Sequence, residues 1–192
     1  MNYKPIIIVS GEPNSVFLEL FFKTLKKYSF KNPLILIGSQ KILLLQMKKF
    51  NFSKKIKLIN INLINDYLLD NKSINLIDVE YNQQKVFKKS SKKSNLYITN
   101  CFNIAIKLLN SGLTDKLLTG PINKKNFLNK KYLGLTEYLA NCFSTKNTAM
   151  LIYNKNLSVC PVTTHLPLKM VSNKINKKII YSKIKLINSF YI

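Results

Sequence analysis

Short apolar runs alternate with longer amphipathic segments over the first two thirds of the chain. Turn residues bound each run, which is typical of buried strands. The runs predict strands at residues 5–10, 34–37, 55–59, 74–79 and 115–119. The segments between them repeat apolar residues at helical spacing. They predict helices at about residues 15–28, 41–49 and 97–110. Alternating strands and helices indicate an α/β fold.

The first predicted helix carries its apolar residues on one side, and we expect that side to face the core. These residues are Phe17, Leu18, Phe21, Phe22 and Leu25. Asn14 or Ser15 is expected to cap the start of the helix. Residues 60–73 are asparagine-rich and fit no single element, and residues 81–95 are expected to form a polar surface loop.

The last third of the chain predicts short helices and one hairpin. The helices are expected at residues 122–128, 136–143, 168–173 and 177–190. Residues 148–153 and 157–162 are expected to pair through an asparagine-rich turn.

The chain's only histidine, His165, follows directly in Thr163-Thr164-His165-Leu166-Pro167-Leu168. A residue after a strand is expected at the carboxyl edge of a sheet, where open α/β sheets bind ligands. Imidazole is a common metal ligand and a proton carrier. The alternative is that His165 is a helix cap or a polar residue with its hydrogen bonds satisfied.

Thirty-one lysines and eight acidic residues give the chain a formal charge of +23. Such a charge is typical of nucleic-acid-binding proteins, but the chain contains no arginine. Arginine is the residue that contacts phosphates and bases with two parallel hydrogen bonds. The lysines are also spread along the whole sequence. This pattern argues against a nucleic-acid partner, and the net field favours small anionic ligands.

The three cysteines, Cys101, Cys142 and Cys160, lie far apart among apolar residues. An odd, widely spaced set suits reduced thiols in a cytoplasmic protein better than disulfides or a zinc site. No apolar stretch approaches the roughly 20 residues of a membrane span, so we expect no membrane partner.

Three turns carry candidate binding residues. In Gly11-Glu12-Pro13, glycine allows close backbone approach before a helix start that favours anions. In Thr119-Gly120-Pro121-Ile122-Asn123-Lys124, an amide and an ammonium group could contact a phosphate or carboxylate. In Gly134-Leu135-Thr136-Glu137, Thr136 could hold a ligand or cap the next helix. The alternatives are a plain turn for the first motif and helix capping for the other two.

Together with residues 163–168, these motifs resemble, in order and approximate spacing, those of the 4-hydroxythreonine-4-phosphate dehydrogenase (PdxA) family. The resemblance covers residues 1–192 but only the N-terminal half, or somewhat more, of the family's length. It implies a two-lobed α/β sandwich like that of isocitrate and isopropylmalate dehydrogenases, here without its C-terminal part. It also implies a homodimer with residues of both subunits in each site.

The family's reaction is the oxidation of 4-phosphohydroxy-L-threonine by NAD or NADP. Decarboxylation then gives 3-amino-2-oxopropyl phosphate, in pyridoxal 5′-phosphate (vitamin B6) biosynthesis. In the family, three histidines hold a divalent cation, which we expect to be zinc, magnesium or cobalt and to act as a Lewis acid. By position, His165 matches the first of them, and Thr136 matches a substrate-binding threonine.

The chain departs from the family pattern at several places. Leu135 occupies the position of a substrate-binding histidine and has no hydrogen-bonding side chain. Residues 14–17 replace a glycine-rich continuation of the first turn. The other two metal histidines, and a lysine, an asparagine and an arginine that bind substrate, lie beyond residue 192.

Gly11, Glu12, Gly120, Asn123 and Lys124 remain candidates for binding substrate or cofactor. The alternative functions are a catalytically inactive remnant of the enzyme and a basic nucleic-acid-binding protein.

Overall fold

The computed structural model describes residues 3–83, 92–128 and 131–192. It divides into two compact units, Met1–Phe127 and Leu128–Ile192. We describe each unit by itself. In neither unit does the described part of the chain contain a helix long and apolar enough to cross a bilayer.

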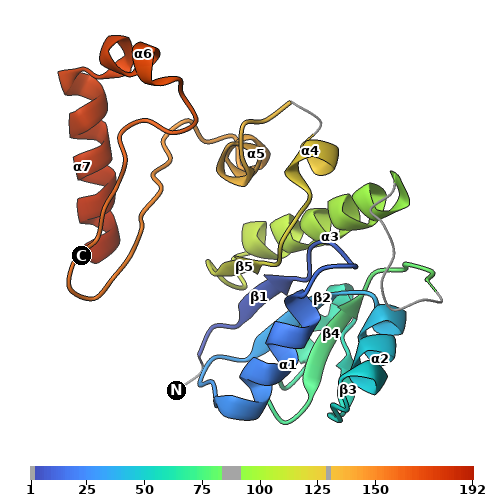
Figure 1. Ribbon diagram of the computed structural model, residues 1–192. Helices are drawn as coiled ribbons and strands as arrows, with labels where there is room; N and C mark the ends of the chain where they lie inside the picture. The colour runs from blue at the N-terminus through green and yellow to red at the C-terminus, as the bar shows by residue number, and fades with distance from the viewer. Residues whose placement is uncertain (1–2, 84–91, 129–130) are drawn as a thin grey trace. The chain divides into compact units, whose positions relative to one another are not determined.

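The first unit is built on a parallel sheet in the order β3-β4-β2-β1-β5 (Figure 1). Its strands are β1 (Ile6–Val9), β2 (Leu34–Gly38), β3 (Ile56–Leu58), β4 (Ile74–Asp78) and β5 (Leu117–Thr119). In the central register, Ile8 lies opposite Leu36 on one side and Leu118 on the other. All five predicted strands are confirmed, and so is the α/β fold. Because the strands run in the same direction, their carboxyl ends share one edge.

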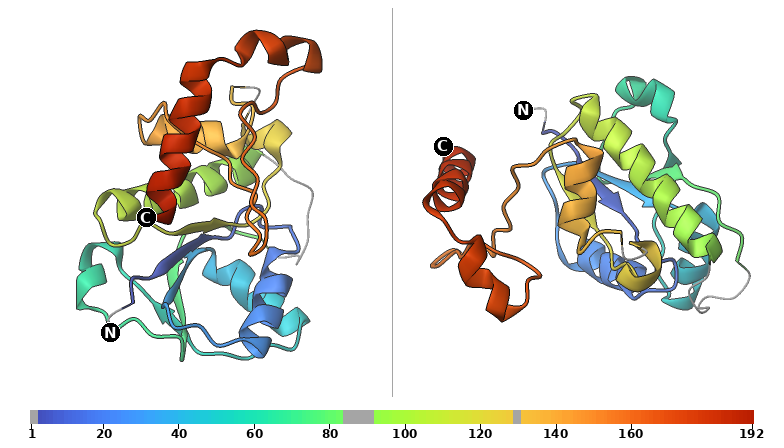
Figure 2. Two further views of the ribbon diagram at one scale, coloured as in Figure 1. Left: turned by 90° about the vertical axis from the view of Figure 1, so that its left-hand side faces the viewer. Right: turned by 90° about the horizontal axis from the view of Figure 1, so that it is seen from above.

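Helices cover both faces of this sheet (Figure 2). They are α1 (Phe17–Lys27), α2 (Gln40–Lys49), α3 (Lys92–Asn110) and α4 (Lys124–Phe127), with a 3₁₀ helix at Ile61–Asp66. Residues with even numbers in β1 and β2, such as Ile8 and Leu36, join a cluster with Phe22 of α1 and Leu43 of α2. The alternate residues lie on the other face, which α3 covers. The predicted core face of α1 is confirmed.

Two local predictions for this unit are wrong. Val16, rather than Asn14 or Ser15, precedes α1, although the Ser15 hydroxyl accepts a hydrogen bond from the Phe17 amide at 3.3 Å. The helix predicted from residue 97 begins at Lys92, inside the expected polar loop. Tertiary contacts explain this earlier start. Ser94 is buried, and the side-chain amide of Asn95 donates a hydrogen bond to the Asn126 carbonyl oxygen at 3.1 Å. The middle of that loop, residues 84–91, lies outside the described residues.

The second unit contains α5 (Leu135–Cys142), α6 (Leu168–Val171), a 3₁₀ turn (Ser172–Lys174) and α7 (Lys177–Tyr191). The predicted hairpin pairs as expected, but only through one antiparallel bridge between Ile152 and Val159. These two side chains are 60% and 50% exposed, so the ribbon has no sheet to pack on. A two-stranded ribbon alone is only marginally stable. The expectation that His165 lies at the carboxyl edge of a sheet is therefore wrong, because it follows an isolated bridge and not a sheet strand.

Candidate functional site

The first two candidate turns meet at the carboxyl edge of β1 and β5. The Glu12 amide donates to the Pro121 carbonyl oxygen at 2.8 Å, and the Gly120 amide donates to the Val9 carbonyl oxygen at 2.8 Å. Two segments more than one hundred residues apart in sequence thus form one edge of the fold. Their expected position at strand ends is confirmed.

Glycine is required on both sides of this contact. Gly11 has φ +72°, and a Cβ there would lie 2.5 Å from the Pro121 oxygen. A Cβ on Gly120 would lie 2.2 Å from the Ser10 carbonyl oxygen. Both obstacles are backbone atoms, so close packing of the turns accounts for both glycines. Ligand binding by Gly11, Glu12 and Gly120 stays a prediction.

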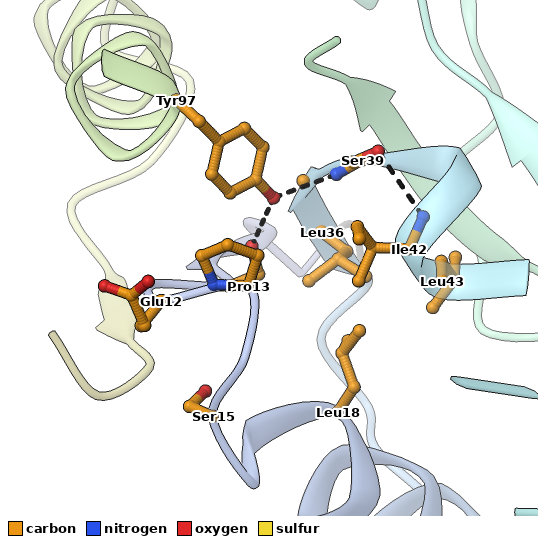
Figure 3. A pocket seen from close by; sticks show the side chains of 11 residues that line it. Glu12, Pro13, Ser15, Leu18, Leu36, Ser39, Ile42, Leu43 and Tyr97 are labelled. Carbon is orange, nitrogen blue, oxygen red and sulfur yellow. Dashed lines mark hydrogen bonds between the residues drawn. The ribbon is translucent and has the colours of Figure 1, made fainter. Parts of the chain in front are cut away.

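Tyr97, from α3, organises a buried polar cluster beside these turns (Figure 3). Its hydroxyl is hydrogen-bonded to the Ser10 hydroxyl at 2.9 Å and accepts from the Ser39 amide at 2.9 Å. Burial raises the pKa of Tyr97 well above its usual value. Burial likewise raises the pKa of the neighbouring Cys101 thiol to about 12. Both groups are therefore neutral at physiological pH and serve as packing and hydrogen-bonding groups.

A small cavity lies against this cluster and is lined on one side by Glu12, Pro13 and Ser15. Its volume of about 10 Å³ is close to what one water molecule requires. The cavity is too small to hold a nicotinamide dinucleotide, so we assign no step of hydride transfer to it. Tyr97 was not predictable as part of this cluster, because 87 residues separate it from Ser10 and no local sequence pattern connects them.

The end of the second motif lies at the start of α4. The Asn123 side-chain oxygen accepts a hydrogen bond from the Asn126 amide at 3.3 Å. This bond favours the capping interpretation for Asn123. Lys124 is exposed at the first position of the helix. Ligand binding by these two residues stays a prediction.

The third motif begins α5 in the second unit. Gly134 is the N-cap, so Leu135, Thr136 and Glu137 are the first three residues of the helix. The capping alternative for Thr136 is wrong, because Thr136 lies inside the helix. Within the described residues its hydroxyl makes no hydrogen bond. It is therefore available to a ligand.

His165 and Glu137 converge on Gly134. The His165 Nε2 and the Glu137 Oε2 lie 3.1 Å and 2.8 Å from the point that a Cβ on Gly134 would occupy. The φ of Gly134 is −156°, which any residue adopts, so the glycine relieves no backbone strain, and a Cβ there would displace the ends of the Glu137 and His165 side chains. The structure thus brings the third motif and the histidine motif together, as the sequence could not show.

His165 itself has φ +57°, in the left-handed region. Residues other than glycine rarely adopt it, and such strained residues cluster at functional sites. In the described part of the chain, the imidazole makes no hydrogen bond to protein. A nitrogen donor beside a carboxylate fits a divalent cation. Within residues 3–83, 92–128 and 131–192, no group of three or more histidine, cysteine or acidic side chains could hold a metal ion.

The next turn of α5 carries Tyr138. Burial raises the pKa of Tyr138 to about 12, with a further contribution from the Cys142 thiol. Its ring packs edge-on against Tyr132, with the ring centroids 5.5 Å apart. Tyr138 is therefore protonated at neutral pH and packs against Tyr132.

Comparison with known proteins gives one consistent family. A family model described as "Pyridoxal phosphate biosynthetic protein PdxA" matches residues 29–191. The 4-hydroxythreonine-4-phosphate dehydrogenase of Sulfurihydrogenibium sp. is 34% identical over 187 residues, which cover 95% of this chain and 56% of the relative. The Aquifex aeolicus protein of the same name is 34% identical over 197 residues, covering 98% and 58%. The chain thus spans little more than half the length of these relatives.

Solved structures show the same fold. A 4-hydroxythreonine-4-phosphate dehydrogenase from Burkholderia phymatum is 26% identical, with a TM-score of 0.81, and covers 96% of this chain and 57% of its own. A second structure with this name, from Klebsiella pneumoniae, is 23% identical and has a TM-score of 0.83. The match covers 98% of this chain and 58% of the Klebsiella chain. The fold expected from the sequence is confirmed over the part of these structures that the chain spans.

Proposed function

This chain belongs to the PdxA family, and from that premise we propose that it oxidises 4-phosphohydroxy-L-threonine with NAD or NADP. Decarboxylation to 3-amino-2-oxopropyl phosphate follows, as a step of pyridoxal 5′-phosphate synthesis. The observation that carries the proposal is the convergence of two family motifs at Gly134, where His165 Nε2 lies 3.1 Å from the position of an absent Cβ. The family match over residues 29–191 supports the reaction class.

His165 is the proposed metal ligand of this chain. A divalent cation, whether zinc, magnesium or cobalt, supplies Lewis-acid chemistry that favours ionisation of the substrate hydroxyl and stabilises the charge left by loss of CO₂. The His165 nitrogen has no competing hydrogen bond within the described residues. The residue has the left-handed backbone conformation, which is typical of functional sites. Both features make the ring a ready donor.

Thr136 and Leu135 are the proposed substrate contacts. The Thr136 hydroxyl lies in the first turn of α5, where the helix dipole favours an anionic group such as a carboxylate or a phosphate. Leu135 offers only apolar contact, where the family has a hydrogen-bonding histidine. We therefore expect the chain to bind its substrate with one polar contact fewer than its relatives.

We also propose that the chain forms a homodimer and acts in the cytoplasm. In the second unit, α7 exposes Tyr181, Ile184 and Tyr191 by more than half of their surface, and spacings of three and seven residues place them on one face of the helix. Monomeric proteins rarely leave large contiguous apolar patches in water, so these residues support an interface with a second subunit. The three free cysteines favour a reducing compartment.

The proposed function is tested by following NADH or NADPH formation at 340 nm. The chain is supplied with 4-phosphohydroxy-L-threonine, either nucleotide, and zinc, magnesium or cobalt. We expect turnover that a chelator abolishes and that His165→Ala lowers at least a hundredfold. No turnover above that of His165→Ala with any of the three metals would show a catalytically inactive member of the family.

A further inference from the structure

We propose that Glu137 is a second protein ligand, beside His165, of the divalent cation of the proposed function, on which this inference rests. The sequence offers an imidazole and a carboxylate for such a pair only once in this part of the chain. His165 is the only histidine of 192 residues, and Glu137 is the only acidic residue between positions 128 and 192. Although 28 positions separate them, their Nε2 and Oε2 atoms both lie within 3.1 Å of one point above Gly134.

The Glu137 carboxylate lacks the partner that its place in the helix would give it. It is the third residue of α5, where a glutamate commonly accepts a hydrogen bond from the amide of the N-cap residue. Within the described residues Glu137 makes no such bond, and its Oε2 is buried without a hydrogen-bond partner. Burying an unpaired carboxylate oxygen is costly, and a cation held there would compensate the charge.

Attraction to the helix dipole alone does not account for this arrangement. A dipole favours negative charge anywhere in the first turn, and an exposed carboxylate would satisfy it. It explains neither why Oε2 is buried without a hydrogen-bond partner nor why the N-cap residue is a glycine beside His165. Both follow if the space above Gly134 has to admit two ligands.

Charge supplies a further reason for a carboxylate at this place. The whole chain carries +23, a field that repels a divalent cation. A neutral imidazole adds no compensating charge, whereas a carboxylate oxygen does. Carboxylate and imidazole together suit zinc in particular.

The test is a Zn²⁺ titration of the full 192-residue chain, read by NMR at the imidazole protons of His165. Because the chain has one histidine, these signals report this site even if zinc also contacts a thiol. We expect saturable shifts in the wild type. Glu137→Gln keeps the shape of the side chain and should raise the zinc Kd at least tenfold. Gly134→Ala removes no ligand but fills the shared space, and should also raise it severalfold.

Glu19→Gln is the matched control, because Glu19 also lies in the first turn of a helix, α1. It should leave the zinc Kd within twofold, and circular dichroism should show all variants folded. A Kd for Glu137→Gln within twofold of the wild type would overturn the role of Glu137 while leaving His165 as a ligand. No zinc-dependent shift in the wild type at millimolar zinc would overturn both this inference and the proposed metal site.

Discussion

Replacing Gly11 by alanine tests whether the two turns at the sheet edge are packed as closely as the structure shows. Gly11→Ala places an L side chain at φ +72° and a Cβ 2.5 Å from the Pro121 oxygen and 2.8 Å from the Gly120 carbonyl carbon. The backbone conformation costs about 1–2 kcal/mol. The contact with immobile backbone adds about 1–3 kcal/mol, the range for overpacking.

Gly112→Ala separates the two contributions. Gly112 has φ +77°, and a Cβ there would meet nothing within 4 Å. Both variants therefore carry nearly the same strain from a positive φ. The alanine also reduces the conformational freedom of the unfolded chain by nearly the same amount in both. The difference between them measures the contact of the turns alone. We expect Gly11→Ala to be less stable than Gly112→Ala by about 1–3 kcal/mol.

Urea denaturation followed by circular dichroism measures this difference. Both variants should keep the wild-type m-value, so that the midpoints report the free energy of unfolding. Equal midpoints for the two variants would show that the turn of Gly11 does not press against Pro121, and the packing argument for both glycines would be wrong.

Three further predictions concern the buried cluster and the substrate contact. Tyr97→Phe leaves the Ser39 amide without its acceptor and should destabilise the chain by about 1–3 kcal/mol, whereas Tyr28→Phe, exposed at 56%, should change the urea midpoint little. Burial raises the Cys101 pKa from 9.0 to about 12, so its protonated state favours the folded chain. This contribution is complete below pH 9 and is lost as pH rises toward 12, and unfolding midpoints measured across that window should fall less steeply in Cys101→Ala. Leu135→His should restore one hydrogen bond to substrate and lower its KM severalfold in the 340 nm assay, and an unchanged KM would contradict this role for position 135.

The sheet could be predicted from the sequence because its signal is local. The strands at residues 6–9 and 34–38 are runs of isoleucine, leucine and valine buried on both faces, and such runs predict parallel strands directly. The positions of the turns followed from the strands. Most helices were predictable for the same reason, since their apolar spacing is a property of consecutive residues.

The parts that the sequence analysis missed depend on contacts between distant segments. The first turn of α3 is polar and is fixed by contacts such as that of Asn95 with Asn126. The position of His165 was misjudged because an apolar run before it resembled a sheet strand, whereas in the structure that run makes a single bridge. The meeting of Glu137 and His165 needs the three-dimensional path of residues 138–164. Periodicity carries no information about that path.

Mass-spectrometric analysis of the product, with His165→Ala as the control, tests the proposed reaction itself. The chain is incubated with 4-phosphohydroxy-L-threonine, NAD or NADP, and a divalent cation. We expect 3-amino-2-oxopropyl phosphate, formed with loss of one CO₂ and transfer of one hydride to the nucleotide, and only in the presence of the metal. Substrate recovered unchanged from the wild-type chain, or an equal product yield from His165→Ala, would contradict the proposed reaction.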